Sequence, residues 1–142
     1  MGGAIRDILM GSRPKDFDIA TNATPEQVRS IFKKSRIIGR RFKLVHVIYG
    51  REIIEVSTFR AKPLQKIHMS NGVLKDNEYG SIEEDAERRD FTINALYYNV
   101  EEKKLIDFYG GLKDIENQKL RLIGNPKLRY KEDPIRLLRA IR

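Results

Sequence analysis

The sequence contains no cysteine and only two histidines, so the side chains on which many redox and metal sites depend are largely missing. Without cysteine, disulfide bonds, cysteine-ligated zinc and thiol catalysis are excluded. His46 and His68 alone are too few for a histidine-rich metal centre. No apolar run approaches the roughly 18 residues that a transmembrane helix needs, and the N-terminus has no apolar signal segment. We therefore expect a cytoplasmic protein without a transmembrane segment.

Basic residues are in excess: 28 Lys and Arg stand against 20 Asp and Glu in 142 residues, which gives a net charge of +8. This excess favours a polyanionic partner, although a solvated basic surface would give the same charge. Several arginines stand beside acidic residues, which solubility alone does not require. Arg88 and Arg89 lie between Glu87 and Asp90, and Arg136, Arg139 and Arg142 follow Glu132 and Asp133 along the last predicted helix.

The spacing of apolar and helix-capping residues predicts short helices mixed with strands, and hence an α/β (α+β) fold. Thr24 and Gln27 have the pattern of a capping box, and Ser81 with Glu84 repeats it. Helices are predicted over 4–10, from 24 to near 35, after 81 and from 133 onwards; strands are predicted over 16–19, 43–49, 52–59, 105–106 and 120–123; a loop is predicted over 61–80 and a helical turn or strand over 91–96. The last helix continues to the final residue and no strand precedes the first turn, so we expect both ends to lie within a longer protein.

The first group of candidate site residues combines a glycine turn with two acids. Gly2 and Gly3 precede the first predicted helix, where backbone N–H groups and a positive helix end can receive phosphate. Asp16 and Asp18 are two positions apart, so on a strand their carboxylates point to the same face. Two such carboxylates repel each other unless a cation lies between them, and hard oxygen ligands suit Mg²⁺. Together these features predict a triphosphate site beside a metal site.

A third carboxylate is expected on a neighbouring strand. Glu55 is the candidate by spacing, because it interrupts the apolar run Ile53-Ile54-Glu55-Val56, where an unpaired buried carboxylate would be costly. The alternative is that Glu55 faces solvent or pairs with Arg60.

Two further groups mix arginines with acids. Arg89, Asp90 and Asn94 offer a guanidinium for phosphate, a carboxylate for ribose hydroxyls and an amide for a hydroxyl or a base edge, although the acids before them would also suit a solvated helix face. On the last predicted helix, Arg136 and Arg139 share a face with Asp133. These three either form salt bridges within the helix or contact a base edge and phosphate.

Five motifs follow one another along almost the whole chain. Their order resembles that of the class II template-independent nucleotidyltransferases, which are bacterial poly(A) polymerases and tRNA CCA-adding enzymes. The motifs are Gly2-Gly3-x-x-Arg6-Asp7, Asp16-Phe17-Asp18, the run Arg88-Arg89-Asp90-Phe91-Thr92-Ile93-Asn94-Ala95-Leu96, Asp107-Phe108-Tyr109-Gly110-Gly111 and Glu132-Asp133-Pro134-Ile135-Arg136.

The resemblance implies a head domain of the polymerase β nucleotidyltransferase superfamily over residues 1–124 and the start of a helical neck over 125–142. It also implies ATP as substrate, two Mg²⁺ ions as cofactors and an RNA 3′ end as acceptor. In this family the matching residues are metal ligands (Asp16, Asp18), triphosphate contacts (Gly3 and Arg6, with Gly2 beside them), the ribose and phosphate motif (Arg89, Asp90, Asn94) and the base-selecting motif (Asp133, Arg136, Arg139). Either Glu55 or Asp90 could be the third catalytic acid.

Residues 39–47 favour the poly(A) polymerase branch, since CCA-adding enzymes tend to carry a Lys-His-Gly-Thr type of segment there. The resemblance thus predicts transfer of AMP from ATP to RNA 3′ ends, as in mRNA processing by polyadenylation. CCA addition to tRNA is the close alternative. A non-catalytic RNA-binding fragment is a second one, for which the basic charge would suffice but which leaves Asp16 and Asp18 unexplained. We also expect residues 1–142 to be inactive in isolation.

Overall fold

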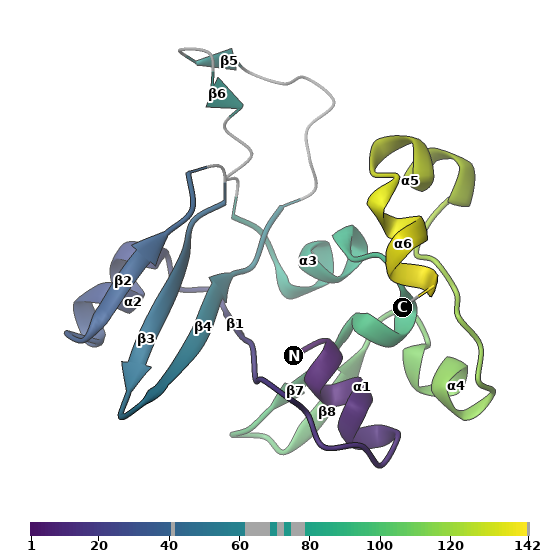
Figure 1. Ribbon diagram of the computed structural model, residues 1–142, viewed down its shortest axis with the longest axis horizontal. Coiled ribbons are helices and arrows are strands. Elements are labelled where there is room, and N and C mark those ends of the chain that lie inside the picture. The colour runs from purple at the N-terminus through teal and green to yellow at the C-terminus, as the bar shows by residue number, and fades with distance from the viewer. Residues whose placement is uncertain (41, 62–68, 71–72, 75–78, 142) are drawn as a thin grey trace. The chain divides into compact units, whose positions relative to one another are not determined.

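The computed structural model describes residues 1–40, 42–61, 69–70, 73–74 and 79–141 (Figure 1). The chain forms two compact units. The first, here called the two-segment unit, combines Met1–Lys15 with Ala86–Arg142, and the second, the sheet unit, is Asp16–Asp85. Both units mix helices with strands, which confirms the predicted fold class.

The sheet unit is built on a four-stranded sheet in the order β1-β4-β3-β2 (Figure 1). Its antiparallel hairpin confirms the two strands predicted on either side of Gly50 and Arg51. The first strand pairs with β4 in parallel, whereas β2 and β3 are antiparallel. The strands are β1 (Ile19–Thr21), β2 (Ser35–Ile38), β3 (Leu44–Tyr49) and β4 (Glu52–Thr58).

One face of this sheet is covered by α2 (Pro25–Ile31). The predicted capping box is present: the Thr24 hydroxyl accepts from the Gln27 amide at 3.3 Å, and the Gln27 side chain accepts from the Thr24 amide at 2.8 Å. Val28 is the residue of this helix that packs with the core valines of β3 and β4. The prediction that the helix runs to near Ser35 was wrong, because the backbone becomes extended at Phe32 and Ser35 begins β2.

The remainder of the sheet unit follows β4. Two short strands, β5 (Met69–Ser70) and β6 (Val73–Leu74), pair antiparallel within the stretch predicted as a loop. The rest of that prediction, at 62–68, 71–72 and 75–78, lies outside the described residues. The sheet unit ends within helix α3 (Ile82–Arg88), whose residues from Ala86 onward belong to the two-segment unit. This helix begins with the second predicted capping box, in which Ser81 and Glu84 exchange hydrogen bonds of 2.7 and 3.2 Å.

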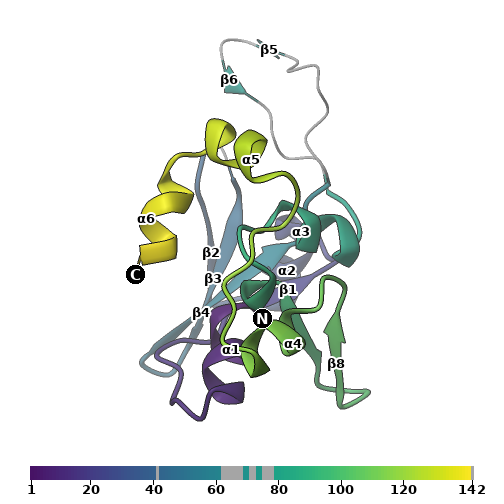
Figure 2. The same ribbon diagram turned by 90° about the vertical axis from the view of Figure 1, so that its right-hand side faces the viewer.

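The two-segment unit joins an N-terminal helix to the C-terminal part of the chain. Its buried apolar residues include Phe91, Ala95, Leu96, Tyr97 and Ile123. Its elements are α1 (Gly3–Leu9), η1 (Thr92–Asn94), β7 (Leu96–Asn99), β8 (Lys104–Asp107), α4 (Gly111–Glu116), α5 (Pro126–Glu132) and α6 (Ile135–Ile141). Its last two helices, α5 and α6, are joined through residues 133–134 and run in different directions (Figure 2).

Sequence patterns were less successful here than in the sheet unit. The strand predicted over 120–123 was wrong, because only a single bridge, between Phe91 and Leu122, forms there. Helix α4 was not predicted either, since it begins from a turn in which the Asp107 carboxylate accepts the amides of residues 109–112. This turn depends on Gly111, because a Cβ there would collide with the Thr92 carbonyl.

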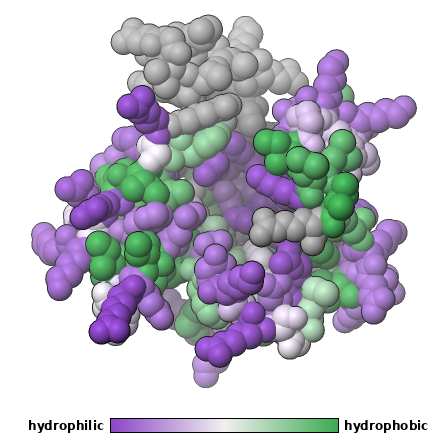
Figure 3. Space-filling view, in the orientation of Figure 1, coloured by the Kyte–Doolittle hydropathy of each residue, from purple (hydrophilic) through white to green (hydrophobic). Residues whose placement is uncertain are grey.

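Apolar side chains gather on the molecular surface over the sheet and over α5 and α6 (Figure 3). On α6 these exposed side chains belong to Ile135, Leu137, Leu138 and Ile141. None of the helices in the described part of the chain has the length and apolar character needed to span a membrane.

The Asp114 carboxylate joins η1 to the segment after α4. Asp114 is buried and accepts the Thr92 hydroxyl at 2.6 Å and the Arg121 Nε at 2.9 Å. The hydrogen bond from Thr92 lowers the pKa of Asp114, and Arg121 lowers it further against the opposing effect of burial. Because the folded-state pKa is lowered, this carboxylate stabilises the fold above its ordinary pKa and the contribution is lost as the pH falls through the lowered value.

Replacing Asp114 with Asn should therefore destabilise the protein at neutral pH by about 1–3 kcal/mol, since the buried Thr92 hydroxyl and the Arg121 guanidinium lose a charged acceptor. Urea unfolding of both proteins over a pH series would measure this difference. We expect the difference to shrink as the pH is lowered. A difference that stays constant into the acid range would contradict the assignment.

Candidate functional site

The predicted site residues fall into two groups, one in each unit. The sheet unit carries Asp16, Asp18 and Glu55. The two-segment unit carries the others, namely Gly2, Gly3, Arg6, Arg89, Asp90, Asn94, Asp133, Arg136 and Arg139.

Asp16 and Asp18 lie in the segment that leads into β1. The strand itself begins at Ile19, so the expectation that it starts at Asp16 was wrong. Asp16 is exposed and Asp18 is half-buried. In the parallel register Ile19 is opposite Val56, and one step back along both strands brings Asp18 opposite Glu55. Residues in register point to the same side of a sheet, so Asp18 and Glu55 share a face.

Glu55 lies on the sheet face opposite the valine core, because its neighbour Val56 is buried in that core. Its cross-strand partner is His46, whose Nε2 is 3.7 Å from the Glu55 Oε2. The alternative partner considered from sequence, Arg60, has its guanidinium 4.3 Å from the centre of the Phe42 ring. Glu55 is therefore a half-exposed carboxylate beside an imidazole rather than a buried charge.

The donors of this segment suit magnesium. Asp16 and Asp18 supply hard oxygen ligands close together in the chain, and Mg²⁺ takes one or two carboxylates while keeping waters and substrate phosphates as its other ligands. No cluster of three or more His, Asp or Glu side chains fit for a metal occurs among the described residues. A magnesium ion bound here would take only some of its ligands from Asp16 and Asp18 and the others from waters and substrate phosphate.

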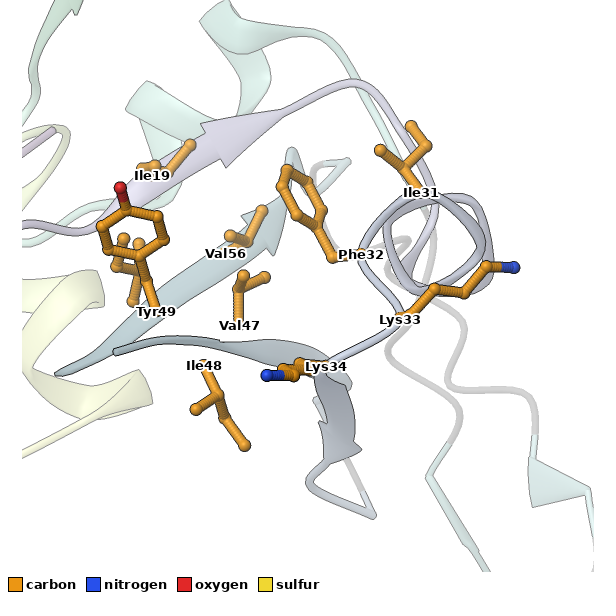
Figure 4. A pocket seen from close by; sticks show the side chains of 10 residues that line it. Ile19, Ile31, Phe32, Lys33, Lys34, Val47, Ile48, Tyr49 and Val56 are labelled. Atoms are coloured by element: carbon orange, nitrogen blue, oxygen red, sulfur yellow. The ribbon is translucent and has the colours of Figure 1, made fainter. Parts of the chain in front are cut away.

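An apolar hollow of about 360 Å³ lies elsewhere in the sheet unit (Figure 4). Ile19, Phe32 and Val56 surround it, and its only charged lining residues are Lys33 and Lys34 (Figure 4). Ile19 and Val56 point to the face opposite that of Asp18 and Glu55. The hollow is therefore not the candidate site.

In the two-segment unit, the predicted phosphate turn lies against the Arg89 side chain. Gly2 has a φ of +62°, and its amide donates to the Leu96 carbonyl at 2.8 Å. A Cβ on Gly2 would lie 3.0 Å from the Arg89 Nη1 and 3.4 Å from the Asn94 carbonyl oxygen. Gly3 is the first residue of α1. A side chain at position 2 would therefore push the Arg89 guanidinium slightly out of this place.

The side chain of Asn94 joins α1 to the predicted ribose motif. Its Oδ1 accepts from the Arg6 Nη1 at 2.7 Å, and its Nδ2 donates to the Asp90 Oδ1 at 3.2 Å. Arg6 also binds the Asp7 carboxylate with its Nη2, at 2.7 Å. Arg89 donates from Nε to the Tyr97 hydroxyl at 2.9 Å and from Nη1 to the Asn94 carbonyl at 3.4 Å.

Among the predicted acidic site residues, Asp90 is the most buried, with 8% of its surface exposed. Its Oδ1 accepts the Phe91 amide at 2.8 Å in addition to Asn94. Its Oδ2 lies 3.3 Å from the Nη1 of Arg139, which extends from α6. The structure thus brings six predicted residues into one network, namely Gly2, Arg6, Arg89, Asp90, Asn94 and Arg139.

The other two residues of the predicted base-selecting motif have internal partners. Arg136 is buried, and its Nη1 donates to the Arg129 carbonyl at 2.9 Å and to the Glu132 carboxylate at 3.2 Å. The Asp133 carboxylate accepts the Ile135 amide at 3.1 Å, at the start of α6. The Arg139 side chain is 57% exposed against 11% for that of Arg136, so the two arginines do not share one open face.

Sequence patterns missed Arg129 as a part of this arrangement. Its Nη2 lies within hydrogen-bonding distance of the carbonyls of residues 87, 88 and 89, immediately before Asp90. The sequence gives no signal for this contact, because all three acceptors are main-chain carbonyls and every residue has one.

In comparisons with known proteins, the chain matches a family model and is similar to proteins named poly(A) polymerase and CCA-adding enzyme. The model of the "Poly A polymerase head domain" family matches residues 1–121. Poly(A) polymerase I of Escherichia coli O6:H1 is 53% identical over 150 aligned residues, which cover 100% of this chain and 32% of that protein. The CCA-adding enzyme of Bacillus licheniformis is 41% identical over 143 residues, which cover 100% of this chain and 35% of that protein.

Among solved structures, the crystal structure of the Bacillus stearothermophilus CCA-adding enzyme in complex with CTP matches with a TM-score of 0.82 and 37% identity. That match covers 99% of this chain and 32% of the other. The chain thus spans about a third of the length of these relatives.

Proposed function

Since this chain belongs to the Poly A polymerase head domain family, we propose that it forms the nucleotide-binding and catalytic part of a polynucleotide adenylyltransferase. The supporting observation is the network around Asp90, in which a buried carboxylate, an amide and three arginines from separate segments converge. Such a set offers donors to phosphate and both donors and acceptors to ribose hydroxyls.

The proposed reaction is transfer of AMP from ATP to an RNA 3′ end. The 3′-hydroxyl oxygen forms a bond to the α-phosphorus, the bond from that phosphorus to the oxygen bridging to the β-phosphorus breaks, and pyrophosphate leaves. Arg6 and Arg89, with the Gly2-Gly3 turn, bind the triphosphate. Because no side chain forms a covalent bond to substrate, positioning and charge stabilisation account for the catalysis.

Asp90 and Asn94 are assigned to the ribose hydroxyls, and Asp133, Arg136 and Arg139 to the base. Arg139 suits such a role best of the last three, because its side chain is largely exposed while it still reaches Asp90. Arg136 could take part only by leaving its bonds to Glu132 and the Arg129 carbonyl.

Asp16 and Asp18 would hold the two magnesium ions, whose chemistry when bound is to lower the pKa of the 3′-hydroxyl and to neutralise the pyrophosphate. Glu55 is proposed as the third carboxylate, since the strand register places it on the same sheet face as Asp18, but it does not form a metal-ready cluster with Asp16 and Asp18 in the described part of the chain. Asp90 already accepts hydrogen bonds from the Phe91 amide, Asn94 and Arg139.

Adenylyl transfer is favoured over CCA addition by the comparison of relatives. Identity to the named poly(A) polymerase is 53%, against 41% to the named CCA-adding enzyme, and both alignments cover the whole chain. CCA addition remains the second candidate because the solved structure described above is that of a CCA-adding enzyme with CTP.

The metal assignment predicts that Asp16→Asn and Asp18→Asn each reduce AMP incorporation by the full-length enzyme roughly a hundredfold or more, because charge stabilisation at the reacting phosphate is lost. The fold should survive both substitutions, since asparagine has nearly the same size and shape as aspartate, and the melting temperature of each variant checks this. Glu52→Gln, an exposed acid of β4, serves as the control and should leave activity unchanged. Normal incorporation by either Asp variant at saturating Mg²⁺ would refute the assignment.

The choice of nucleotide separates the two candidate functions. The full-length enzyme, given a tRNA that lacks its CCA end and CTP alone, should incorporate no CMP, whereas ATP should support repeated addition of AMP to an unstructured RNA. Gel analysis of labelled products measures both. Incorporation of CMP would assign the protein to CCA addition.

The glycine turn provides a further test, with two glycines of the same unit compared. Gly2 and Gly11 both have positive φ, at +62° and +74°, so alanine at either position strains the backbone and should cost about 1–3 kcal/mol of stability. Only at Gly2 does the added Cβ press on Arg89, since nothing lies within 4 Å of the corresponding position at Gly11. Gly2→Ala should therefore weaken ATP binding about tenfold by displacing a phosphate ligand. Calorimetric titration should find ATP affinity unchanged in Gly11→Ala, and equal losses in both variants would contradict the proposal.

A further inference from the structure

Arg129 binds the end of the helix that precedes the proposed nucleotide motif. Its Nη2 is 3.2 Å from the Glu87 carbonyl oxygen, 2.8 Å from that of Arg88 and 2.7 Å from that of Arg89. Helix α3 ends at Arg88, and the last carbonyls of a helix have no acceptor role within the helix itself. A cation at this end satisfies those carbonyls and complements the negative end of the helix dipole.

The Arg129 guanidinium is itself held from the other side. Its Nη1 binds the Glu132 carboxylate at 3.0 Å, and the same carboxylate binds the Arg136 Nη1 at 3.2 Å. Arg136 in turn donates to the Arg129 carbonyl. With side-chain exposures of 16% and 11%, the two arginines are well shielded from solvent, where charge-assisted hydrogen bonds are strong and directional.

The bound carbonyls lead directly into the residues that would contact the nucleotide. Arg89 supplies both the third carbonyl and the guanidinium beside Gly2, and Asp90 follows it. On the other side, the Asp90 carbonyl accepts the Ile123 amide at 2.9 Å. The backbone of Arg89 and Asp90 is therefore held between Arg129 and Ile123.

We propose that Arg129 is a positioning residue for nucleotide recognition, which holds the backbone before Asp90 so that the Asp90 carboxylate and the Asn94 amide meet the ribose hydroxyls. This inference rests on the proposed function, because it concerns the ribose contacts assigned there. Arg129 itself touches no substrate. Its effect is carried by three main-chain carbonyls.

A merely stabilising role makes a different prediction. Loss of a buried arginine lowers the melting temperature in either case. Only a positioning role also changes the ratio of the affinities for ATP and for its deoxy analogues. The test therefore compares dissociation constants for ATP and for its 2′-deoxy and 3′-deoxy analogues, measured by calorimetric titration of the full-length enzyme.

Arg129→Met should weaken ATP binding about tenfold but binding of each deoxy analogue only about threefold, because the contacts that are lost are those made to the hydroxyls and each analogue has one hydroxyl fewer. Arg129→Lys keeps the charge but cannot bind carbonyls and carboxylate with one planar fork, so its ATP preference should fall between those of wild type and the Met variant. Arg121→Met is the matched control, since Arg121 also binds a carboxylate and a carbonyl, those of Asp114 and Tyr109. It should lower the melting temperature and leave the ATP preference unchanged.

A wild-type ATP preference in both Arg129 variants would overturn the inference, and if the Met variant does not fold, the same result in Arg129→Lys alone would do so. Asp90→Asn separates this failure from failure of the proposed function. If Asp90→Asn abolishes the preference and the Arg129 variants keep it, only the role of Arg129 is wrong. If Asp90→Asn itself keeps the preference, the ribose assignment of the proposed function is wrong.

Discussion

The carboxylate of Asp90 is the interaction on which the two-segment unit depends. Through its two oxygens it binds the Asn94 side chain and Arg139, and through Asn94 it reaches Arg6 on α1. Residues separated by 88 positions in the chain thus share a single hydrogen-bonded path. A buried carboxylate without these donors would destabilise the fold, so the requirement to satisfy Asp90 is also a requirement to bring α1, η1 and α6 together. The carboxylate oxygens of Asp90 therefore serve both the stability of the fold and the proposed nucleotide recognition.

The sheet unit is stabilised by apolar packing rather than by a buried carboxylate. Its core consists of valines from α2, β3 and β4, whose burial aligns the strands, and the strand alternation then places His46 and Glu55 on the opposite face. Asp18 joins that face through the parallel pairing of β1 with β4. Asp18 and Glu55 can share this face because the apolar residues fill the other side. Hydrophobic register, rather than a polar contact, thus places Asp18 and Glu55 on the face where the proposed magnesium site would lie.

Local signals in the sequence predicted the elements that local chemistry determines. The capping boxes at Thr24 and Ser81, and the hairpin around Gly50, were predicted correctly because each depends on residues only a few positions apart. The end of α2, the false strand at 120–123 and the unpredicted α4 and α5 depend on tertiary contacts, such as the bridge between Phe91 and Leu122. Motif order indicated which residues belong to the site. It did not indicate that Arg136 would be buried while Arg139 stays exposed, because i and i+3 spacing on a helix does not say which side of it the protein covers.

Arg129 shows why such contacts escape prediction from sequence. A salt bridge between side chains requires a residue of opposite charge somewhere in the chain, but main-chain carbonyls occur at every position and carry no sequence signal. What makes residues 87–89 suitable acceptors is that α3 ends there, and the end of a helix is the part of it that sequence patterns locate least well. Glu132 adds a second condition, since it orients Arg129 and Arg136 together. Through Arg129 and Arg136, Glu132 therefore connects the backbone before Asp90 to the start of α6. This contact is a structural reason for an acid at the first position of the Glu132-Asp133-Pro134 motif, next to the residues assigned to the base.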